Sequence, residues 1–264
     1  MELTPFTSLT VAMQPNNDRH TITLPSDWLQ GRTAYGGLSA ALCLEATQRS
    51  VPDLPPLRSA QFCFVGPATG RLTVGADVLR RGKSTVLVGA DLSGDGGLAV
   101  RSTLCFGTGR PSVHDYQNLA MPQVPGPKEC PSYYVWPNRP NFMNHFDGRL
   151  VRGATPRTPG AKPEMTVWLR HYDTGDESSL VRLLALADAL PPAAVILSTE
   201  HTPISTVTWS IDMLEGKPFS ATGWWLVQAT ADTSREGYSA QSTVIWSPDG
   251  EPVLVARQNV AIFG

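Results

Sequence analysis

Apolar residues recur at intervals of three and four in two segments of the chain, residues 36–49 and 178–190. These apolar positions are Leu38, Ala41, Leu42 and Ala46 in the first segment and Leu180, Leu183, Leu184 and Ala187 in the second. Such spacing places the apolar side chains on one face of a helix. Pro52 and Pro191 follow the two segments, and proline disfavours helix continuation. The pattern predicts two long helices.

Most of the remaining chain consists of short runs rich in β-branched and aromatic residues, separated by turn residues, which predicts β-strands. The runs are residues 59–65, 71–79, 84–92 and 98–106 in the first half and 165–172, 204–213, 223–231, 238–246 and 252–263 in the second. Residues 111–163 contain ten prolines and little periodicity. This stretch is interpreted as a connector between the halves.

The two halves repeat each other. Three pairs of matching positions are each 155 residues apart: Gly82 and Gly237, Val100 and Val255, and Thr103 and Gln258. Each half therefore reads as one helix followed by antiparallel strands that are joined by Asp-Gly hairpins. A helix buried against one face of a sheet leaves the sheet edges open, and two copies can cover each other's edges.

Composition and charge exclude several classes of function. The net charge of −2 comes with no basic stripe, which argues against nucleic acid binding. The four cysteines lie far apart, and no histidine pair has metal-ligand spacing, so we expect no disulfide, metal or cofactor. The chain start has no signal-peptide pattern, and no apolar run approaches the ~20 residues of a membrane span. These features predict a cytoplasmic protein.

Several short motifs occur in a characteristic order along the chain. They are Tyr35-Gly36-Gly37, Phe64-x-x-Pro67-x-x-Gly70, Arg81-Gly82-Lys83-Ser84, Leu186-Ala187-Asp188, Trp224 or Trp225, Asp249-Gly250 and Val255-Ala256-Arg257-Gln258. On these motifs the chain resembles the double hot-dog acyl-CoA thioesterases, the acyl-CoA thioesterase II family and its thioesterase-like relatives. The resemblance covers most of residues 24–107 and 165–263.

The resemblance implies an α+β fold, a tandem hot-dog in which one continuous antiparallel sheet wraps two long helices. Its expected parts are an N-terminal repeat (1–110), a proline-rich connector (111–164) and a C-terminal repeat (165–264). The implied activity is hydrolysis of acyl-CoA thioesters to free acid and CoA, with acyl-CoA as the partner and no cofactor. Exposed sheet edges add the expectation of a homo-oligomer, a dimer or larger.

In the family, an Asp, a Thr or Ser and a Gln of the second repeat hold the hydrolytic water. The Gln matches Gln258, whereas alignment of residues 203–211 puts Thr206 where the family has its carboxylate. The hydroxyl position falls near residues 230–233, which leaves Thr230, Asp232 and Thr233 as candidates. Either Asp232 replaces the missing carboxylate or the site is inactive.

The start of the first predicted helix is the candidate oxyanion site. Free backbone N–H groups and the positive end of the helix dipole gather there, and Gly36 and Gly37 after Tyr35 allow a carbonyl to approach. We expect the N–H groups of Gly37 and Leu38 to be the donors. The alternative is that the glycines only form a tight turn.

A small basic hairpin is the candidate contact for the phosphates of CoA. It comprises Arg80, Arg81 and Lys83. The alternative interpretation is a solvated turn.

Two other functions remain open at this point. Because Thr206 takes the place of the expected Asp, one is a catalytically silent protein that binds acyl-CoA or another apolar ligand. The other is a structural role in an assembly.

Overall fold

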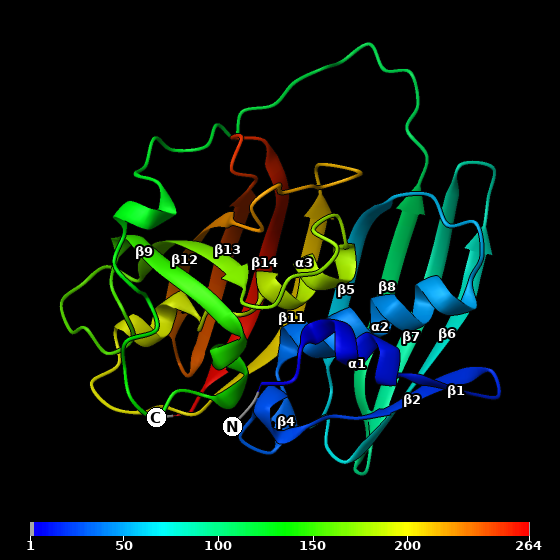
Figure 1. Cartoon of the computed structure of the whole chain (residues 1–264), viewed down its shortest axis with the longest axis horizontal. Coiled ribbons are helices and arrows are strands. Elements are labelled where there is room, and N and C mark those ends of the chain that lie inside the picture. Colours follow the sequence, from blue (N-terminus) through cyan, green and yellow to red (C-terminus); the bar gives the residue numbers. More distant parts are fainter. Residues whose placement is uncertain (1–2, 264) are drawn as a thin grey trace.

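The computed structural model describes residues 3–263, in which two halves of the chain share one antiparallel sheet of 12 strands (Figure 1). The strand order is β1-β2-β6-β7-β8-β5-β11-β14-β13-β12-β10-β9, so the halves join where β5 pairs with β11. The strands of the N-terminal half are β1 (Gln14–Asn16), β2 (Arg19–Thr23), β5 (Leu57–Phe64), β6 (Arg71–Arg81), β7 (Thr85–Gly94) and β8 (Gly97–Gly107). The others are β9 (Phe146–Gly153), β10 (Glu164–His171), β11 (Ile204–Met213), β12 (Trp225–Arg235), β13 (Tyr238–Trp246) and β14 (Pro252–Ile262). A separate ribbon pairs β3 (Leu29–Gln30) with β4 (Thr33–Ala34).

The strands follow from alternation of apolar and polar residues. In β7, the buried side chains are Val86, Val88, Ala90 and Leu92, and they face the helices. The hairpins occur where the sequence predicts them: the loop between β7 and β8 is Asp95-Gly96, and Gly97 has a φ of +95° that a residue with a Cβ rarely adopts.

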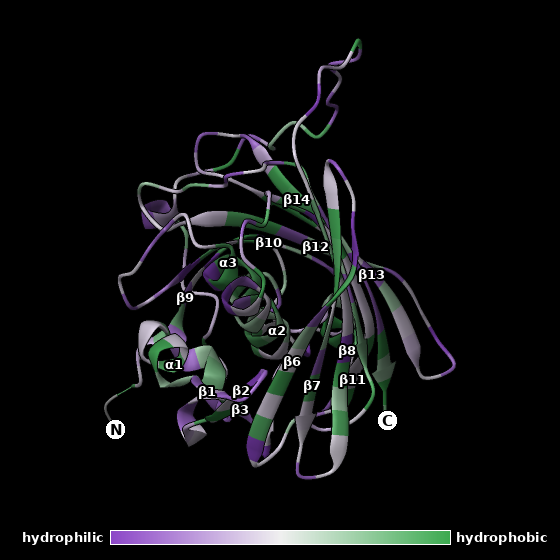
Figure 2. Ribbon diagram, turned by 90° about the vertical axis from the view of Figure 1, so that its right-hand side faces the viewer, coloured by the Kyte–Doolittle hydropathy of each residue, from purple (hydrophilic) through white to green (hydrophobic). Residues whose placement is uncertain are grey.

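Helix α2 (Gly36–Ser50) begins and ends close to the predicted bounds. The apolar pattern predicted one buried face, but ten of its residues are buried because the sheet curves around the helix (Figure 2). Helix α1 (Phe6–Ala12) is a short N-terminal addition. None of the helices described in residues 3–263 has the length and apolar content needed to cross a bilayer.

The second predicted long helix is shorter than expected. Helix α3 covers only Leu180–Ala187, begins after Ser179, whose side chain caps it, and ends at Asp188. Pro191 and Pro192 then separate it from the 3₁₀ helix η4 (Ala193–Ile196). The expectation of two long helices is therefore corrected to one long helix and one of eight residues.

The proline-rich connector contains regular structure that its composition did not predict. It includes η2 (Pro127–Glu129), η3 (Asn141–His145) and strand β9, which pairs with β10 at the sheet edge. Residues 119–130 cross the outer face of the sheet, where Trp246 and Trp168 donate their indole N–H groups to the carbonyls of Leu119 and Pro125. The connector thus covers a cluster of outward-facing tryptophans.

The N-terminal segment is tied to the second half through a buried polar cluster. The backbone N–H of Phe6 donates to Asp173, which also accepts from Arg182 at 3.1 Å. His171 is buried beside them, 5.3 Å from the Phe6 ring, and its Nε2 donates to the carbonyl of Arg182. His145 lies in the same region and stacks on Trp28 with the ring centres 3.8 Å apart.

Because of this cluster, we expect the stability of the folded protein to fall in acid. Burial, with the charge of Arg182, lowers the pKa of His171 from 6.5 to about 3. Between pH 6.5 and about pH 3, His171 is therefore protonated in the unfolded chain but neutral in the folded chain. The contribution of His171 to stability is complete above pH 6.5 and is lost as the pH falls toward 3. Relative to His171→Asn, the free energy of unfolding of the wild type should fall by up to about 1.4 kcal/mol per pH unit in that window. Denaturant titrations of both proteins at several pH values measure this, and parallel curves would contradict it.

Candidate active site

A cavity of about 690 Å³ opens where the start of α2, the end of β5, the connector and the loop after α3 meet. Its apolar wall includes Phe64, Val100, Trp136, Phe142, Met143 and Leu190. Its polar groups include Ser39, Asp188 and Thr206. The volume lies within the range of about 300–1,000 Å³ that small-molecule sites occupy. The wall combines apolar side chains with polar and charged ones.

Asp188 stands at the junction of α3 and α2. It is the residue that follows α3, and the N-terminus of α2 lies against it. A Cβ atom on Gly36 would lie 2.6 Å from Oδ2 of Asp188, and one on Gly37 would lie 2.9 Å from the Asp188 Cβ. The two glycines therefore let the carboxylate approach the positive end of the α2 dipole, where an anion is stabilised.

Two donors hold the Asp188 carboxylate. The side-chain amide of Gln258 donates to Oδ1 at 2.5 Å, and the backbone N–H of Gly37 also donates to the carboxylate. The side chain is enclosed by protein but keeps some exposed surface toward the cavity. Burial raises the pKa of Asp188 from 3.8 to about 6, although both hydrogen bonds act to lower it. A carboxylate with a pKa near neutrality is suited to accept and release a proton.

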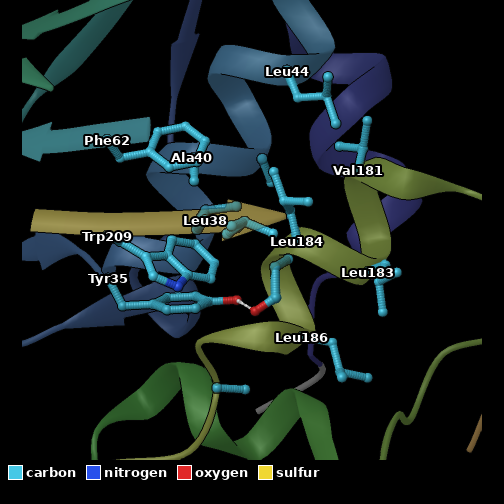
Figure 3. Close-up of a cluster of buried hydrophobic side chains, with 14 of the residues drawn as sticks. Tyr35, Leu38, Ala40, Leu44, Phe62, Val181, Leu183, Leu184, Leu186 and Trp209 are labelled. Atoms are coloured by element: carbon cyan, nitrogen blue, oxygen red, sulfur yellow. Dashed lines mark hydrogen bonds between the residues drawn. The ribbon is translucent and has the colours of Figure 1, made fainter. Parts of the chain in front are cut away.

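Tyr35 fixes the position of the two helix ends. Its hydroxyl donates to the carbonyl of Ala185 in α3 at 3.0 Å. Figure 3 shows the Tyr35 ring pointing toward α3. Its ring stacks on Phe142 with the ring centres 3.9 Å apart, and burial raises the pKa of the phenol, which stays protonated as a donor. Tyr35 thereby holds the end of α3, and with it Asp188, against the start of α2.

Profiles of known families match almost the whole chain. The acyl-CoA thioesterase N-terminal domain matches residues 24–107, and the acyl-CoA thioesterase C-terminal domain matches residues 119–262, more than half of the chain. The chain belongs to the acyl-CoA thioesterase family. Membership of this family supports acyl-thioester hydrolysis as the general type of reaction. A comparison with curated protein sequences returns no match.

Solved structures similar to this family member share its fold. A conserved protein with a hot-dog fold from Alicyclobacillus acidocaldarius is 24% identical, with a TM-score of 0.86 and 99% of each chain covered. A tesB protein from Mycobacterium avium subs paratuberculosis is 15% identical, with a TM-score of 0.79 and 98% of each chain covered. The acyl-CoA thioesterase II TesB2 from Mycobacterium marinum is 18% identical, with a TM-score of 0.75 and 97% of each chain covered. These likenesses show an α+β hot-dog fold built on a large antiparallel sheet.

Several residues that the thioesterase resemblance singled out do meet at this site. Gln258 is buried and contacts Asp188, and Tyr35, Gly36 and Gly37 form the adjoining start of α2. Thr206 lies on β11 in the cavity wall. Leu38 is fully buried and does not line the cavity. Because the Gly37 N–H donates to Asp188, it is not free to meet a substrate oxygen, and Gly36 is the residue of this turn that lines the cavity.

Thr230 and Asp232 lie on the other face of the sheet. Side chains alternate along β12, and Ala229 and Ala231 face the core, so Thr230 points outward. Asp232 is exposed on that outer face, where it accepts from Ser242 at 2.8 Å and pairs with Arg257 at 3.0 Å. The expectation that Asp232 replaces a missing carboxylate is therefore corrected: the carboxylate beside Gln258 is Asp188.

The basic hairpin of Arg80, Arg81 and Lys83 is also remote from the cavity. Arg81 donates to the carbonyl of Pro52, just beyond the C-terminal end of α2. A helix of 15 residues is about 22 Å long, and the cavity lies at its other end. The structure does not bring this hairpin to Asp188.

Asp188 was the functional candidate that the sequence reasoning missed. Leu186-Ala187-Asp188 is one of the motifs on which the chain resembles the family, but the motif alone gives the Asp no role. A signal was available, because an acidic residue at the C-terminal end of an apolar helix faces an unfavourable helix dipole. Such a residue needs a compensating partner, and here the start of another helix provides it.

Proposed function

We propose that this protein hydrolyses acyl-CoA thioesters to a free acid and CoA. The observation that carries the proposal is the Asp188 carboxylate, held by Gln258 and the N-terminus of α2 and open to a cavity of small-molecule size. Membership of the acyl-CoA thioesterase family supports the reaction type.

In the proposed reaction, Asp188 accepts a proton from a water molecule as the water oxygen adds to the thioester carbonyl carbon. The negative charge that develops on the carbonyl oxygen is stabilised at the first turn of α2, where the N–H of Gly36 and the helix dipole act together. The intermediate collapses with cleavage of the C–S bond, and the thiolate takes the proton from Asp188 as CoA leaves.

Gln258 and Thr206 support the base in this scheme. The Gln258 amide donates to Oδ1 of Asp188. A carboxylate has about four lone-pair sites, so beside this bond and the one from the Gly37 N–H it can still accept a hydrogen bond from water. Thr206 lines the cavity, and its hydroxyl is suited to orient the water but not to deprotonate it, because an alcohol is too weak a base at neutral pH. The apolar wall, with Phe64, Trp136 and Phe142, suits the acyl group.

The case for a catalytically silent binder depended on a missing carboxylate beside Gln258. Asp188 occupies that place. Hydrolysis is therefore the function we put forward.

A panel of acyl-CoA substrates tests the proposal. Straight-chain, branched and aromatic acyl-CoA esters are incubated with the folded protein, and release of free thiol is followed. We expect turnover of at least one class at a rate well above the rate without protein. No thiol release from any ester, by a sample whose folding is confirmed by circular dichroism, would refute the proposed activity.

The pKa of Asp188 predicts the pH dependence of hydrolysis. Since the base must be ionised, kcat/KM should be constant above about pH 7 and should fall about tenfold per pH unit below the pKa of about 6. Initial rates between pH 4.5 and 8.5 measure this limb. A limb below pH 4.5 would show that Asp188 is not the base, because an unperturbed carboxylate titrates near pH 4.

A further inference from the structure

A second buried glutamine stands behind Gln258. Gln241 on β13 lies directly opposite Gln258 on β14 in the sheet register, and both side chains are buried on the inner face. Nε2 of Gln241 donates to Oε1 of Gln258 at 2.9 Å. Oε1 of Gln241 accepts the backbone N–H of Ala193 at 2.6 Å. The four groups form one chain of hydrogen bonds from Ala193 to Asp188.

We propose that Gln241 is a positioning residue that sets the direction of the Gln258 amide, so that Gln258 always presents a donor to Asp188. The inference rests on the proposed function only for its effect on rate.

The backbone N–H of Ala193 sets the donor-to-acceptor direction of this series of hydrogen bonds. A backbone N–H can only donate, so the atom of Gln241 that faces Ala193 must be its oxygen. The amide nitrogen of Gln241 must then face Gln258, whose accepting atom is again the oxygen. The nitrogen of Gln258 is left to face Asp188. An amide on its own has two orientations of similar shape, and here a backbone group selects one of them.

The N–H of Ala193 is available because of the local sequence. Ala193 is the first residue of η4 and follows Pro191 and Pro192. The first N–H groups of a helix have no carbonyl partner within it. The break that shortens α3 therefore also supplies the donor that orients the two glutamines.

The consequence for Asp188 is chemical. A donor that faces the carboxylate stabilises its ionised form, whereas a carbonyl oxygen in the same place would favour the protonated form. The other titratable groups around Asp188 are the phenols of Tyr35, the residue before α2, and Tyr134 on the connector, which donate to the carbonyls of Ala185 and Ala189. The cavity wall also carries Arg157, Glu200 and His201.

Two substitutions of similar length test the direction of the chain. In Gln241→Glu, an ionised side chain accepts from Ala193 and from Gln258, so the Gln258 amide turns and presents its oxygen to Asp188. In Gln241→Met, the orienting contacts are lost without adding charge. Thr243→Val is the matched control, since Thr243 is also buried and lies two residues further along β13.

Titration of the Asp188 carboxyl by ¹³C NMR is the main measurement, with the signal assigned from Asp188→Asn. We expect the Asp188 pKa to rise in both Gln241 variants, by about one unit or more in Gln241→Glu, which is a tenfold change in proton affinity. Thr243→Val should leave it unchanged. Unchanged titration in the folded Gln241 variants would overturn the inference.

Kinetics provide the second measurement. If the wild type hydrolyses acyl-CoA, the acid limb of kcat/KM should move upward with the Asp188 pKa, while KM stays the same because Gln241 does not line the cavity. If the wild type shows no hydrolysis, the proposed function fails, and the NMR titration still decides the role of Gln241. If neither variant folds, hydrogen exchange of the Gln241 and Gln258 side-chain amide protons in the wild type decides. Slow exchange supports the proposed hydrogen bonds between Ala193, Gln241, Gln258 and Asp188, and fast exchange refutes them.

Discussion

Replacement of Asp188 by Asn is expected to lower kcat/KM for acyl-CoA hydrolysis by about 10²–10⁴-fold, the range that a general base contributes. The amide has nearly the same shape as the carboxylate but cannot accept the proton from water. Steady-state thiol release measures the loss, and KM is expected to change much less than kcat.

Asp232→Asn is the matched control for this experiment. Asp232 belongs to the same half of the chain but lies exposed on the outer face of the sheet, bound to Ser242 and Arg257. Its replacement should leave the rate unchanged. If Asp188→Asn kept the wild-type rate while Asp232→Asn lost activity, the assignment of the base would be wrong.

The same Asp188→Asn variant should be more stable than the wild type above pH 6. The folded pKa of about 6 exceeds the unfolded value of 3.8, so the folded chain binds the proton more tightly and ionisation opposes folding. A shift of two units corresponds to about 3 kcal/mol, and one mismatched hydrogen bond costs about 1 kcal/mol. The expected gain is about 1–2 kcal/mol at pH 8. The gain should shrink below pH 6. Below about pH 4 only the cost of the mismatched hydrogen bond remains, so the variant should be about 1 kcal/mol less stable than the wild type, as chemical denaturation at the two extremes would show.

Replacement of Gly37 by Ala is expected to have the second large effect, on both stability and activity. The added Cβ would lie 2.8 Å from the carbonyl oxygen of Ala185 and 2.9 Å from Cβ of Asp188. Neither neighbour is the end of a flexible side chain, so α2 and α3 must move apart. Such overpacking costs about 1–3 kcal/mol, and the carboxylate moves away from the helix end that holds it. Thermal unfolding and kcat/KM measure the two losses.

Gly96→Ala provides the comparison for Gly37→Ala. Gly96 lies in the hairpin loop between β7 and β8, and a Cβ added there meets no atom within 4 Å. Stability and activity should both stay near the wild-type values. A Gly37→Ala protein as stable and active as Gly96→Ala would show that the close contact of the two helix ends is not required.

The local structure of this protein follows closely from its sequence. The apolar spacing of residues 36–49 predicts α2, and the Asp-Gly turns predict the hairpins of both halves. The 155-residue repeat predicts two similar halves, and the structure joins them through the pair of β5 and β11. These features depend on neighbours within a few residues or on a repeated pattern, so periodicity and turn chemistry are sufficient to find them.

The tertiary structure decided which residues form the candidate site. Asp188 and Gln258 are 70 residues apart and meet because α3 ends against the start of α2 above β14. Asp232 is closer to Gln258 in sequence, yet it lies on the opposite face of the sheet, bound to Arg257. Strand β9, from a connector without visible periodicity, forms only because β10 offers it an edge.

The sequence by itself predicted α2, most of the strands and the Asp-Gly hairpins. It also indicated two similar halves and made Gln258 and the glycines at the start of α2 candidates. Only the tertiary structure decided which carboxylate joins them. The reason is physical. The pattern of apolar and turn residues near a position sets its local conformation. The face of the sheet on which a side chain lies depends on strand register and bulges, and the charge state of that side chain depends on burial and on donors from distant elements.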